Sequence, residues 1–389
     1  MLYKKIEKSF LSVIAKTETG TFTFENQDGK RWDFSGNNPG PHGHLKIHAA
    51  DVLWNMAIGG DTSLAGDYRE GKWDSDDIAS LVDFAFRNEE VMRPFVAGNG
   101  VKRALVAFGA LLRPNTRRRA RANVIAHYDL GNDFYSLWLD DTMSYSSALF
   151  SDDNEPLANA QLRKYDRIID RLGLTPGDVL EIGCGWGGFA ERAIQRGDHR
   201  ITGLTLSPAQ ASFARDRLRA VARQADIRLE DYREPRGKFD SIVSIEMFEA
   251  VGERYWKTYF DQLAAQLASS GKALIQTITV ENDYFDSYRK GGDAVRSYIF
   301  PGGMLPSEQR FAAEAARVGL CLTDTFRFGH DYAITLDRWL SRFDARIEDV
   351  RALGYDEKFI RLWRFYLASC AGAFRCGRTD VLQVEMQHA

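Results

Sequence analysis

Two glutamates stand at the end of an apolar run in SIVSIEMFEAVGERYW, residues 241–256. Residues 241–245 have the apolar, β-branched pattern of a buried strand, and Glu246 and Glu249 follow it among Met, Phe, Ala and Val residues. An ionised carboxylate is costly to place in apolar surroundings unless something compensates its charge. The pair therefore suggests a proton acceptor at an apolar site.

A glycine-rich loop forms the second chemical motif. In VLEIGCGWGG, Gly183, Gly185 and Gly187 come where an apolar strand turns into a helix, and glycine lets backbone approach a ligand closely. A dinucleotide site would need an acid about 20 residues further on, and ITGLTLS has none there. Glu181 precedes the loop, and this arrangement is similar to the S-adenosylmethionine loop of class I methyltransferases. Cys184 in the loop is interpreted as packing.

Alternating strand and helix patterns must position these motifs. They cover residues 178–195, 200–218, 227–234, 238–248, 258–267 and 271–280. Such alternation is typical of a parallel sheet covered by helices. We expect an α/β fold, a class I methyltransferase Rossmann-like sheet, with residues 281–310 inserted as a lid over the active-site mouth.

A smaller α+β domain is expected before this sheet. Residues 21–47 alternate apolar and polar side chains around turn signals, which predicts a small antiparallel sheet, and helices follow. We divide the chain into an N-terminal accessory domain (1–98), a basic linker (99–122) and a catalytic domain (123–389). Lipid presentation and a purely structural role both stay open for the first domain.

Residues 102–121 carry seven Lys or Arg side chains and no acidic residue. One reading is a helix that lies on an anionic membrane surface, and the other is a linker whose arginines are solvated. The formal net charge of −3 argues against a general nucleic-acid binder. The four cysteines lack CxxC or zinc-like spacing, which favours a reduced, cytoplasmic compartment and no metal site. Without a stretch long enough to span a membrane, association with the inner membrane face would be peripheral.

The order of motifs resembles the cyclopropane fatty acid synthase family, which includes mycolic acid cyclopropane synthases. The resemblance covers about residue 123 to the C-terminus. It rests on HYDLGNDFYSLWLDDTMSYSSALF, EIGCGWGG, GLTLSPAQ, IEMFEAVG, IFPGGMLPS and HDYAITLDRW. It implies methyl transfer from S-adenosylmethionine to the cis double bond of an unsaturated phospholipid acyl chain. A carbocation forms on the lipid, and the product is a cyclopropane or a methyl- or methylene-branched chain. A homodimer is left open.

The resemblance also implies the residues of the cofactor site. Expected contacts are Tyr145, Ser146, Glu181, Gly183, Gly185, Gly187, Thr205, Leu206, Ser207, Gln210, Tyr232 and Arg233. For Tyr232 and Arg233, a surface loop is an equal alternative. Aromatic faces can stabilise a cation, and the candidates are Tyr128, Phe134, Tyr135, Tyr145, Phe248, Tyr298, Phe300 and Tyr332.

In this family a bound bicarbonate removes the proton from the cation. The matching positions are Glu249, Tyr332, Gln276 and the main chains of Ser147 and Ile278. The sequence departs from the pattern at Ser147, where cyclopropane synthases typically have Cys, and at Ala250 and Gln276, where they have His. Glu246 stands where they usually have Gly. A second carboxylate would repel bicarbonate, which favours a branched product.

Cys370 matches a cysteine once assigned as catalytic in the family, although a helix cysteine is more often packing. Two other function classes stay open. One is a catalytically silent lipid-binding scaffold, against which the intact loop and the retained Glu249 and Tyr332 argue. The other is a methyltransferase for small molecules, which would not need the motif at residues 127–135.

Overall fold

The computed structural model describes residues 2–96, 130–173, 177–234 and 237–389. Two compact units can be distinguished in it. Among these residues, the first unit takes the chain up to residue 96 together with Asp286–Pro301 and Trp339–Arg378, and the second takes the rest. Packing thus groups two later segments with the N-terminal residues, whereas the division at residues 98 and 122 was by sequence position and stays a prediction. The basic segment lies outside the described residues.

The second unit is built on a seven-stranded sheet in the order β10-β11-β9-β8-β5-β6-β7. The strands are β5 (Asp178–Ile182), β6 (Arg200–Thr205), β7 (Ala225–Leu229), β8 (Phe239–Ile245), β9 (Leu267–Val280), β10 (Leu320–Arg327) and β11 (Thr379–His388). Strands β5 to β9 pair in parallel, and β11 is antiparallel to both β9 and β10. The expected α/β sheet is confirmed, with one antiparallel strand added near its edge.

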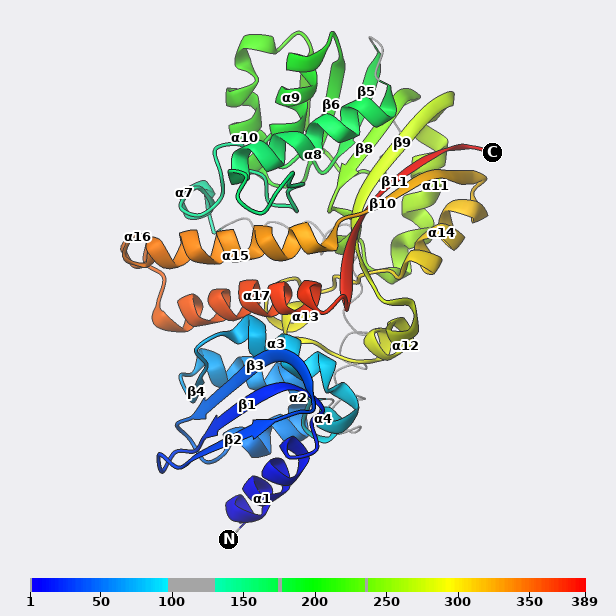
Figure 1. Cartoon of the computed structure of the whole chain (residues 1–389). Helices are drawn as coiled ribbons and strands as arrows, with labels where there is room; N and C mark the ends of the chain where they lie inside the picture. Colours follow the sequence, from blue (N-terminus) through cyan, green and yellow to red (C-terminus); the bar gives the residue numbers. More distant parts are fainter. Residues whose placement is uncertain (1, 97–129, 174–176, 235–236) are drawn as a thin grey trace. The chain divides into compact units, whose positions relative to one another are not determined.

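Helices flank this sheet, as Figure 1 shows for α8 lying across it and for α11 and α14 beside its β9 to β10 end. They are α7 (Asn132–Ser136), α8 (Leu157–Leu172), α9 (Gly188–Arg196), α10 (Pro208–Arg217), α11 (Trp256–Gln266) and α14 (Glu308–Arg317). Short 3-10 turns cover Arg219–Val221, Phe248–Ala250 and Glu253–Tyr255, the last two directly after β8. Helix α15 (Gly329–Ala345) begins in this unit.

The hydrophobic core of the second unit explains why its strands are almost continuously apolar. Val179, Ile201 and Val243 come from three neighbouring strands and pack with Phe189 of α9 and Leu218 after α10. Parallel strands covered by helices bury side chains on both faces. Polar groups therefore gather where β5, β6 and β8 end, which is the edge at which α/β proteins bind ligands.

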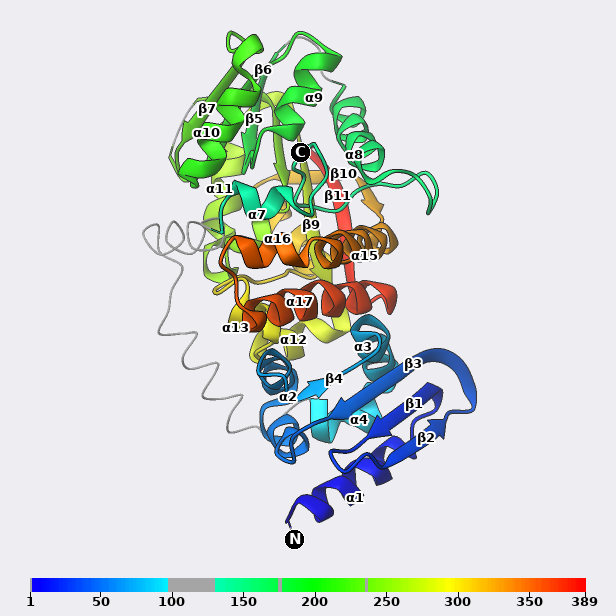
Figure 2. The same ribbon diagram turned by 90° about the vertical axis from the view of Figure 1, so that its left-hand side faces the viewer.

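The first unit contains a four-stranded sheet, β2-β1-β3-β4, seen in two views in Figures 1 and 2. Its strands are β1 (Thr19–Glu25), β2 (Arg31–Ser35), β3 (Asn38–Ile47) and β4 (Trp73–Asp74). The helices of this unit are α1 (Leu2–Ile14), α2 (Val52–Arg69), α3 (Ile78–Arg87), α4 (Glu89–Val96), α13 (Ala294–Tyr298), α16 (Ile347–Ala352) and α17 (Glu357–Arg375).

The prediction of a wholly antiparallel sheet here was wrong, because β1 and β3 are parallel. The backbone amides of Gly36 and Asn38 donate to the carbonyls of Gly20 and Glu18, at 2.9 and 2.8 Å. These bonds carry the chain past the start of β1 to its other edge. A Cβ on Gly36 would lie 2.4 Å from the Glu18 carbonyl carbon, so the close crossing requires glycine.

The insertion after β9 forms α12 (Asn282–Lys290) and α13. Residues 286–301 belong to the first unit, and the expected position of this insertion over the active-site mouth stays a prediction.

Candidate functional site

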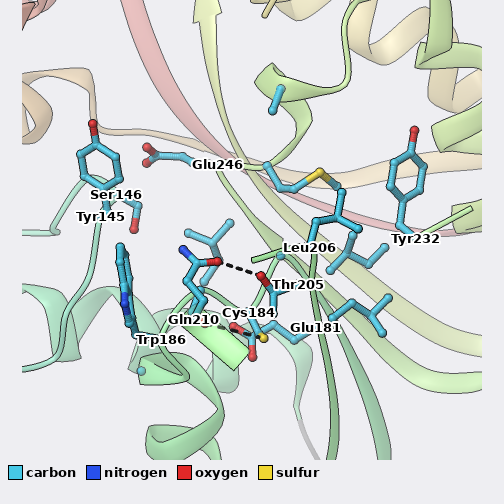
Figure 3. A pocket seen from close by; sticks show the side chains of 18 of the residues that line it. Tyr145, Ser146, Glu181, Cys184, Trp186, Thr205, Leu206, Gln210, Tyr232 and Glu246 are labelled. Atoms are coloured by element: carbon cyan, nitrogen blue, oxygen red, sulfur yellow. Dashed lines mark hydrogen bonds between the residues drawn. The ribbon is translucent and has the colours of Figure 1, made fainter. Parts of the chain in front are cut away.

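A pocket lies at the carboxyl ends of β5, β6, β7 and β8 (Figure 3). Besides the glycine loop, its wall consists of residues 143–146, 204–206 and 245–247, with Glu181, Gln210, Glu230, Tyr232, Arg233, Ala250 and Val251. Figure 3 shows Tyr145 and Trp186 on one side and Tyr232 on the opposite side, with the Glu246 carboxyl group pointing toward Tyr145. Most of the cofactor residues expected from sequence are therefore brought together here.

The glycine loop gives this pocket a surface of exposed backbone. Gly183 and Gly185 have φ of 85° and 51°, in the left-handed region that favours glycine. A Cβ on Gly185 would have no protein atom within 4 Å, so its backbone is open to a ligand. Gly187 instead precedes α9 at φ 83° and faces Ala214, which assigns it to the turn and not to the wall.

Glu181 is the next-to-last residue of β5 and lies in the wall of the pocket. The residue is 3% exposed, and its Oε2 has no hydrogen-bond partner among the described atoms. Burial raises the pKa of the Glu181 carboxyl to about 8, and the Lys164 ammonium opposes the rise. A buried carboxyl group with an unused oxygen is suited to a cationic or hydrogen-bonding ligand.

Thr205, Ser207 and Gln210 form a fixed turn at the start of α10. The Ser207 hydroxyl accepts from the backbone amide of Gln210 and caps the helix, which is why Ser207 is buried behind the wall. Thr205 donates to Oε1 of Gln210 at 2.8 Å, and Figure 3 marks this bond. Because the amide oxygen is used, the Gln210 side chain offers its NH2 group as a donor.

Lys164 supports the pocket from behind Ser146, and no pattern in the sequence had indicated this role. It lies on α8, is fully buried, and donates to the Ser146 hydroxyl at 2.7 Å and to Gln161 Oε1 at 2.6 Å. Burial lowers the Lys164 pKa to about 8, while nearby acids including Glu246 and Glu181 oppose the shift. An ammonium group only donates, so Ser146 accepts from it and keeps its own proton for a ligand in the pocket.

Glu246 accepts three hydrogen bonds at the wall of the pocket. Its Oε1 accepts from the Ser147 backbone amide and the Gln276 side chain, both at 2.8 Å, and its Oε2 accepts from the Tyr332 hydroxyl at 2.6 Å. Burial raises the Glu246 pKa, and these three donors and Lys164 counteract the rise. The backbone has φ 50°, which is strained for a residue with a side chain and is typical of functional sites.

Glu249 lies in the turn after β8 and behaves differently. Its Oε1 accepts from the Ile278 backbone amide and from the Thr277 hydroxyl, while its Oε2 has no partner among the described atoms. Burial and then the charge of Glu246 raise the Glu249 pKa to about 8. The charge of Glu246 thus favours a proton on Glu249, whereas three donors stabilise the carboxylate form of Glu246, which makes Glu246 the candidate base.

This geometry distributes the residues expected at the anion site between two carboxyl groups, and the bicarbonate site itself stays a prediction. We expected Glu249, Tyr332, Gln276, Ser147 and Ile278 to surround one external anion. The structure divides them between two carboxyl groups, because the donors of Ser147, Gln276 and Tyr332 are already used by Glu246. Sequence alone could not show this division, since it depends on where a strained backbone aims the Glu246 side chain.

Other expected residues lie elsewhere. Cys370 is on α17 in the first unit, and burial raises its thiol pKa to about 12, which makes it a poor nucleophile. Tyr298 and Phe300 also belong to that unit. Phe248 packs against Trp256 and Phe311 in the core, and Tyr128 lies outside the described residues.

The sequence matches the model of a protein family described as mycolic acid cyclopropane synthetase over residues 115–384. Tuberculostearic acid methyltransferase UfaA1 of Mycobacterium tuberculosis is 37% identical over 352 residues, which cover 87% of this chain and 82% of that protein. Cyclopropane-fatty-acyl-phospholipid synthase of Escherichia coli is 34% identical, with 87% and 86% covered.

Solved structures show the same relation. Mycolic acid cyclopropane synthase CmaA1 complexed with SAH and CTAB has a TM-score of 0.64 and 34% identity, covering 69% of this chain and 98% of that one. Coclaurine N-methyltransferase has a TM-score of 0.66 over 83% of this chain and 98% of that one. At 17% identity it shows the shared fold only.

Proposed function

Because the chain belongs to the mycolic acid cyclopropane synthetase family and is an S-adenosylmethionine-dependent methyltransferase that modifies lipids, we propose that it methylates the cis double bond of an unsaturated phospholipid acyl chain. We further propose that Glu246 removes the proton that ends the reaction and that the product is methyl- or methylene-branched. The three hydrogen bonds that hold Glu246 at the pocket wall are the observation that supports this assignment most directly.

The described residues fit S-adenosylmethionine. The Gly185 backbone is open to a ligand, Gln210 offers an amide donor, and the unused Glu181 oxygen suits a cationic group. Tyr232 and Arg233 line the same pocket and provide a ring and a buried guanidinium beside it. When bound, the cofactor supplies an electrophilic methyl group.

Glu181→Gln should change cofactor affinity and stability in opposite directions. Loss of the carboxylate is expected to weaken S-adenosylhomocysteine binding about tenfold in calorimetry. Without ligand the variant should be the more stable protein at pH 8. Folded Glu181 resists ionisation up to about pH 8, while unfolded Glu ionises near its ordinary pKa. As pH rises from the ordinary pKa of Glu to about 8, the free energy of unfolding of the wild type therefore falls, by on the order of 1 to 3 kcal/mol.

Thermal unfolding from pH 5 to 8 tests the second part. The difference in unfolding temperature between the variant and the wild type should increase as pH rises. A constant gap, or unchanged affinity, would contradict the role given to Glu181.

Methyl transfer to an alkene leaves a carbocation on the acyl chain, and the residues here decide which proton leaves. Loss from the added methyl carbon with ring closure gives a cyclopropane, and loss from a neighbouring chain carbon gives a methyl-branched alkene. A methylene branch requires a 1,2-hydride shift to the first cationic carbon before the added methyl loses its proton. The donors of Ser147, Gln276 and Tyr332 hold the Glu246 carboxylate in one place. A base that is covalently part of the protein can remove only the protons within its reach. A bound bicarbonate would not be fixed to the polypeptide in this way. This difference supports the branched product.

The proposal is tested with purified protein, S-adenosylmethionine and vesicles of unsaturated phospholipid. We expect release of S-adenosylhomocysteine and an acyl chain heavier by one carbon, with NMR showing a branch and no cyclopropane ring. Cyclopropane signals would overturn only the product assignment and would leave the proposed methyl transfer intact. Cofactor binding without turnover on any unsaturated lipid would favour the silent scaffold, and methylation of small amines or alcohols would favour the third class.

Cys370→Ser is expected to keep wild-type turnover in this assay. The thiol lies outside the pocket wall, and its raised pKa leaves almost no thiolate at neutral pH. A large loss of turnover in a variant that still melts at the wild-type temperature would restore Cys370 as a catalytic candidate.

We also propose peripheral association with the inner face of a membrane, where the acyl substrate would be met. Among the described helices, no segment is both long and apolar enough to cross a bilayer. The basic residues 102–121 support binding to anionic headgroups. Sedimentation with anionic and zwitterionic vesicles tests this, and equal binding to both would contradict it. A homodimer stays a prediction for analytical ultracentrifugation.

A further inference from the structure

Behind Glu246, a line of hydrogen bonds runs through the sheet to α8. Glu246 Oε1 accepts from Gln276 Nε2 at 2.8 Å, Gln276 Oε1 accepts from Gln383 Nε2 at 3.0 Å, and Gln383 Oε1 accepts from the Arg167 guanidinium at 2.6 Å. Gln276 and Gln383 are direct partners in the register of β9 and β11, and both are almost fully buried.

The direction of these bonds is favoured from both ends, because an ionised Glu246 only accepts and Arg167 only donates. A side-chain amide can turn over and exchange its oxygen for its NH2 group, so two adjacent amides do not by themselves fix which group faces Glu246. Arginine only donates, which obliges Gln383 to turn its oxygen to Arg167. The NH2 group of Gln383 then faces Gln276, and the NH2 group of Gln276 faces Glu246.

Arg167 is itself held firmly. Its second nitrogen donates to Asp324 at 3.0 Å on β10, and its guanidinium carbon lies 4.1 Å from the centre of the Phe326 ring. The side chain is 19% exposed. An ion pair, an aromatic contact and the amide thus restrict it to one orientation.

We propose that Arg167, acting through Gln383, is a positioning residue that orients the Gln276 amide so that it donates to the catalytic carboxylate of Glu246. The inference rests on the proposed role of Glu246. Arg167 does not line the pocket, so it acts on the base and not on the substrate. Without this anchor, Gln276 can turn its oxygen to accept from protonated Glu246, which favours the acid form of Glu246 over the carboxylate.

The test uses three variants of the full chain. Arg167→Met removes the anchor, Arg167→Lys keeps a charged donor, and Gln383→Met breaks the line without changing any charge. Arg163→Met is the matched control, because Arg163 lies one turn away on α8, pairs with Glu155 and makes none of these bonds.

Turnover is measured against pH, with S-adenosylhomocysteine affinity and thermal unfolding as checks of the fold. The groups that face Glu246 are Lys164 of α8, Tyr332 of α15 and Glu249 after β8. All three are intact in every variant. For Arg167→Met and Gln383→Met, we expect the acidic midpoint of the rate to rise by about one pH unit. Turnover should fall up to about tenfold on the acidic side of the midpoint and less at neutral pH. Arg167→Lys should return the midpoint toward wild type.

A midpoint equal to wild type in folded Gln383→Met protein would overturn the proposal. An equal shift in Arg163→Met would also overturn it, because the effect would then be one of net charge. Infrared titration of the Glu246 carboxylic acid band, assigned by difference from Glu246→Gln, gives the same answer in protein without lipid. The infrared titration separates failure of this inference from failure of the proposed function. If the proposed function fails, the wild type would show no turnover at all.

Discussion

Glu246→Gln is expected to lower turnover on the order of a thousandfold while leaving S-adenosylhomocysteine affinity near wild type. Glutamine has almost the same shape, and its single carbonyl oxygen can still accept from Ser147 and Gln276. Its NH2 group can donate to the Tyr332 hydroxyl oxygen, but the amide cannot take up a proton. The cation on the acyl chain would then lack its nearest base. Steady-state release of S-adenosylhomocysteine with unsaturated vesicles measures the loss, and calorimetry measures the affinity.

Glu249→Gln is the matched control. Glu249 has its pKa raised to about 8 by burial and by Glu246, so the amide resembles the protonated acid already present at neutral pH. Its Oε1 can still accept from Ile278. We expect this variant to keep a much larger share of turnover than Glu246→Gln. The reverse order would favour the role that the family resemblance implies for Glu249, at the site of a bound bicarbonate.

The parts that sequence predicted well are those set by local pattern. The alternation of strand and helix patterns from residue 178 predicted the parallel strands. The spacing of Glu181 and the glycines predicted the edge of the sheet where the cofactor would bind. The sheet of the first unit was harder to predict. From its pattern alone, the strand at residues 38–47 would be expected to continue an antiparallel hairpin. Only the close crossing at Gly36 sends it to the far edge of β1.

The chemistry at Glu246 was partly visible in the sequence. Its departure from the family pattern could be seen, and so could the replacement of His by Gln276. The sequence could not show that the Gln276 amide donates to Glu246. That contact follows from the positive φ at Glu246 and from the pairing of β9 with β11. Lys164 and Arg167 look like ordinary charges of a surface helix in the sequence. Burial by distant segments is what gives them roles.

Glu246→Gly should produce an enzyme that depends on an added anion. Glycine accepts φ 50° without strain, so the backbone should keep its course. Removing the side chain leaves the donors of Ser147, Gln276 and Tyr332 around an empty space of carboxylate size. We expect very low turnover that formate, acetate or bicarbonate raises roughly tenfold.

Chloride at the same ionic strength is the control, because it carries the charge but is a far weaker base. Equal stimulation by chloride, or none by any carboxylate, would show that these donors do not form the proton-accepting site. The product of the bicarbonate reaction adds a second result. If base position decides which proton leaves, a free anion in the space of Glu246 should increase the cyclopropane fraction, since the anion is no longer fixed through the backbone of residue 246.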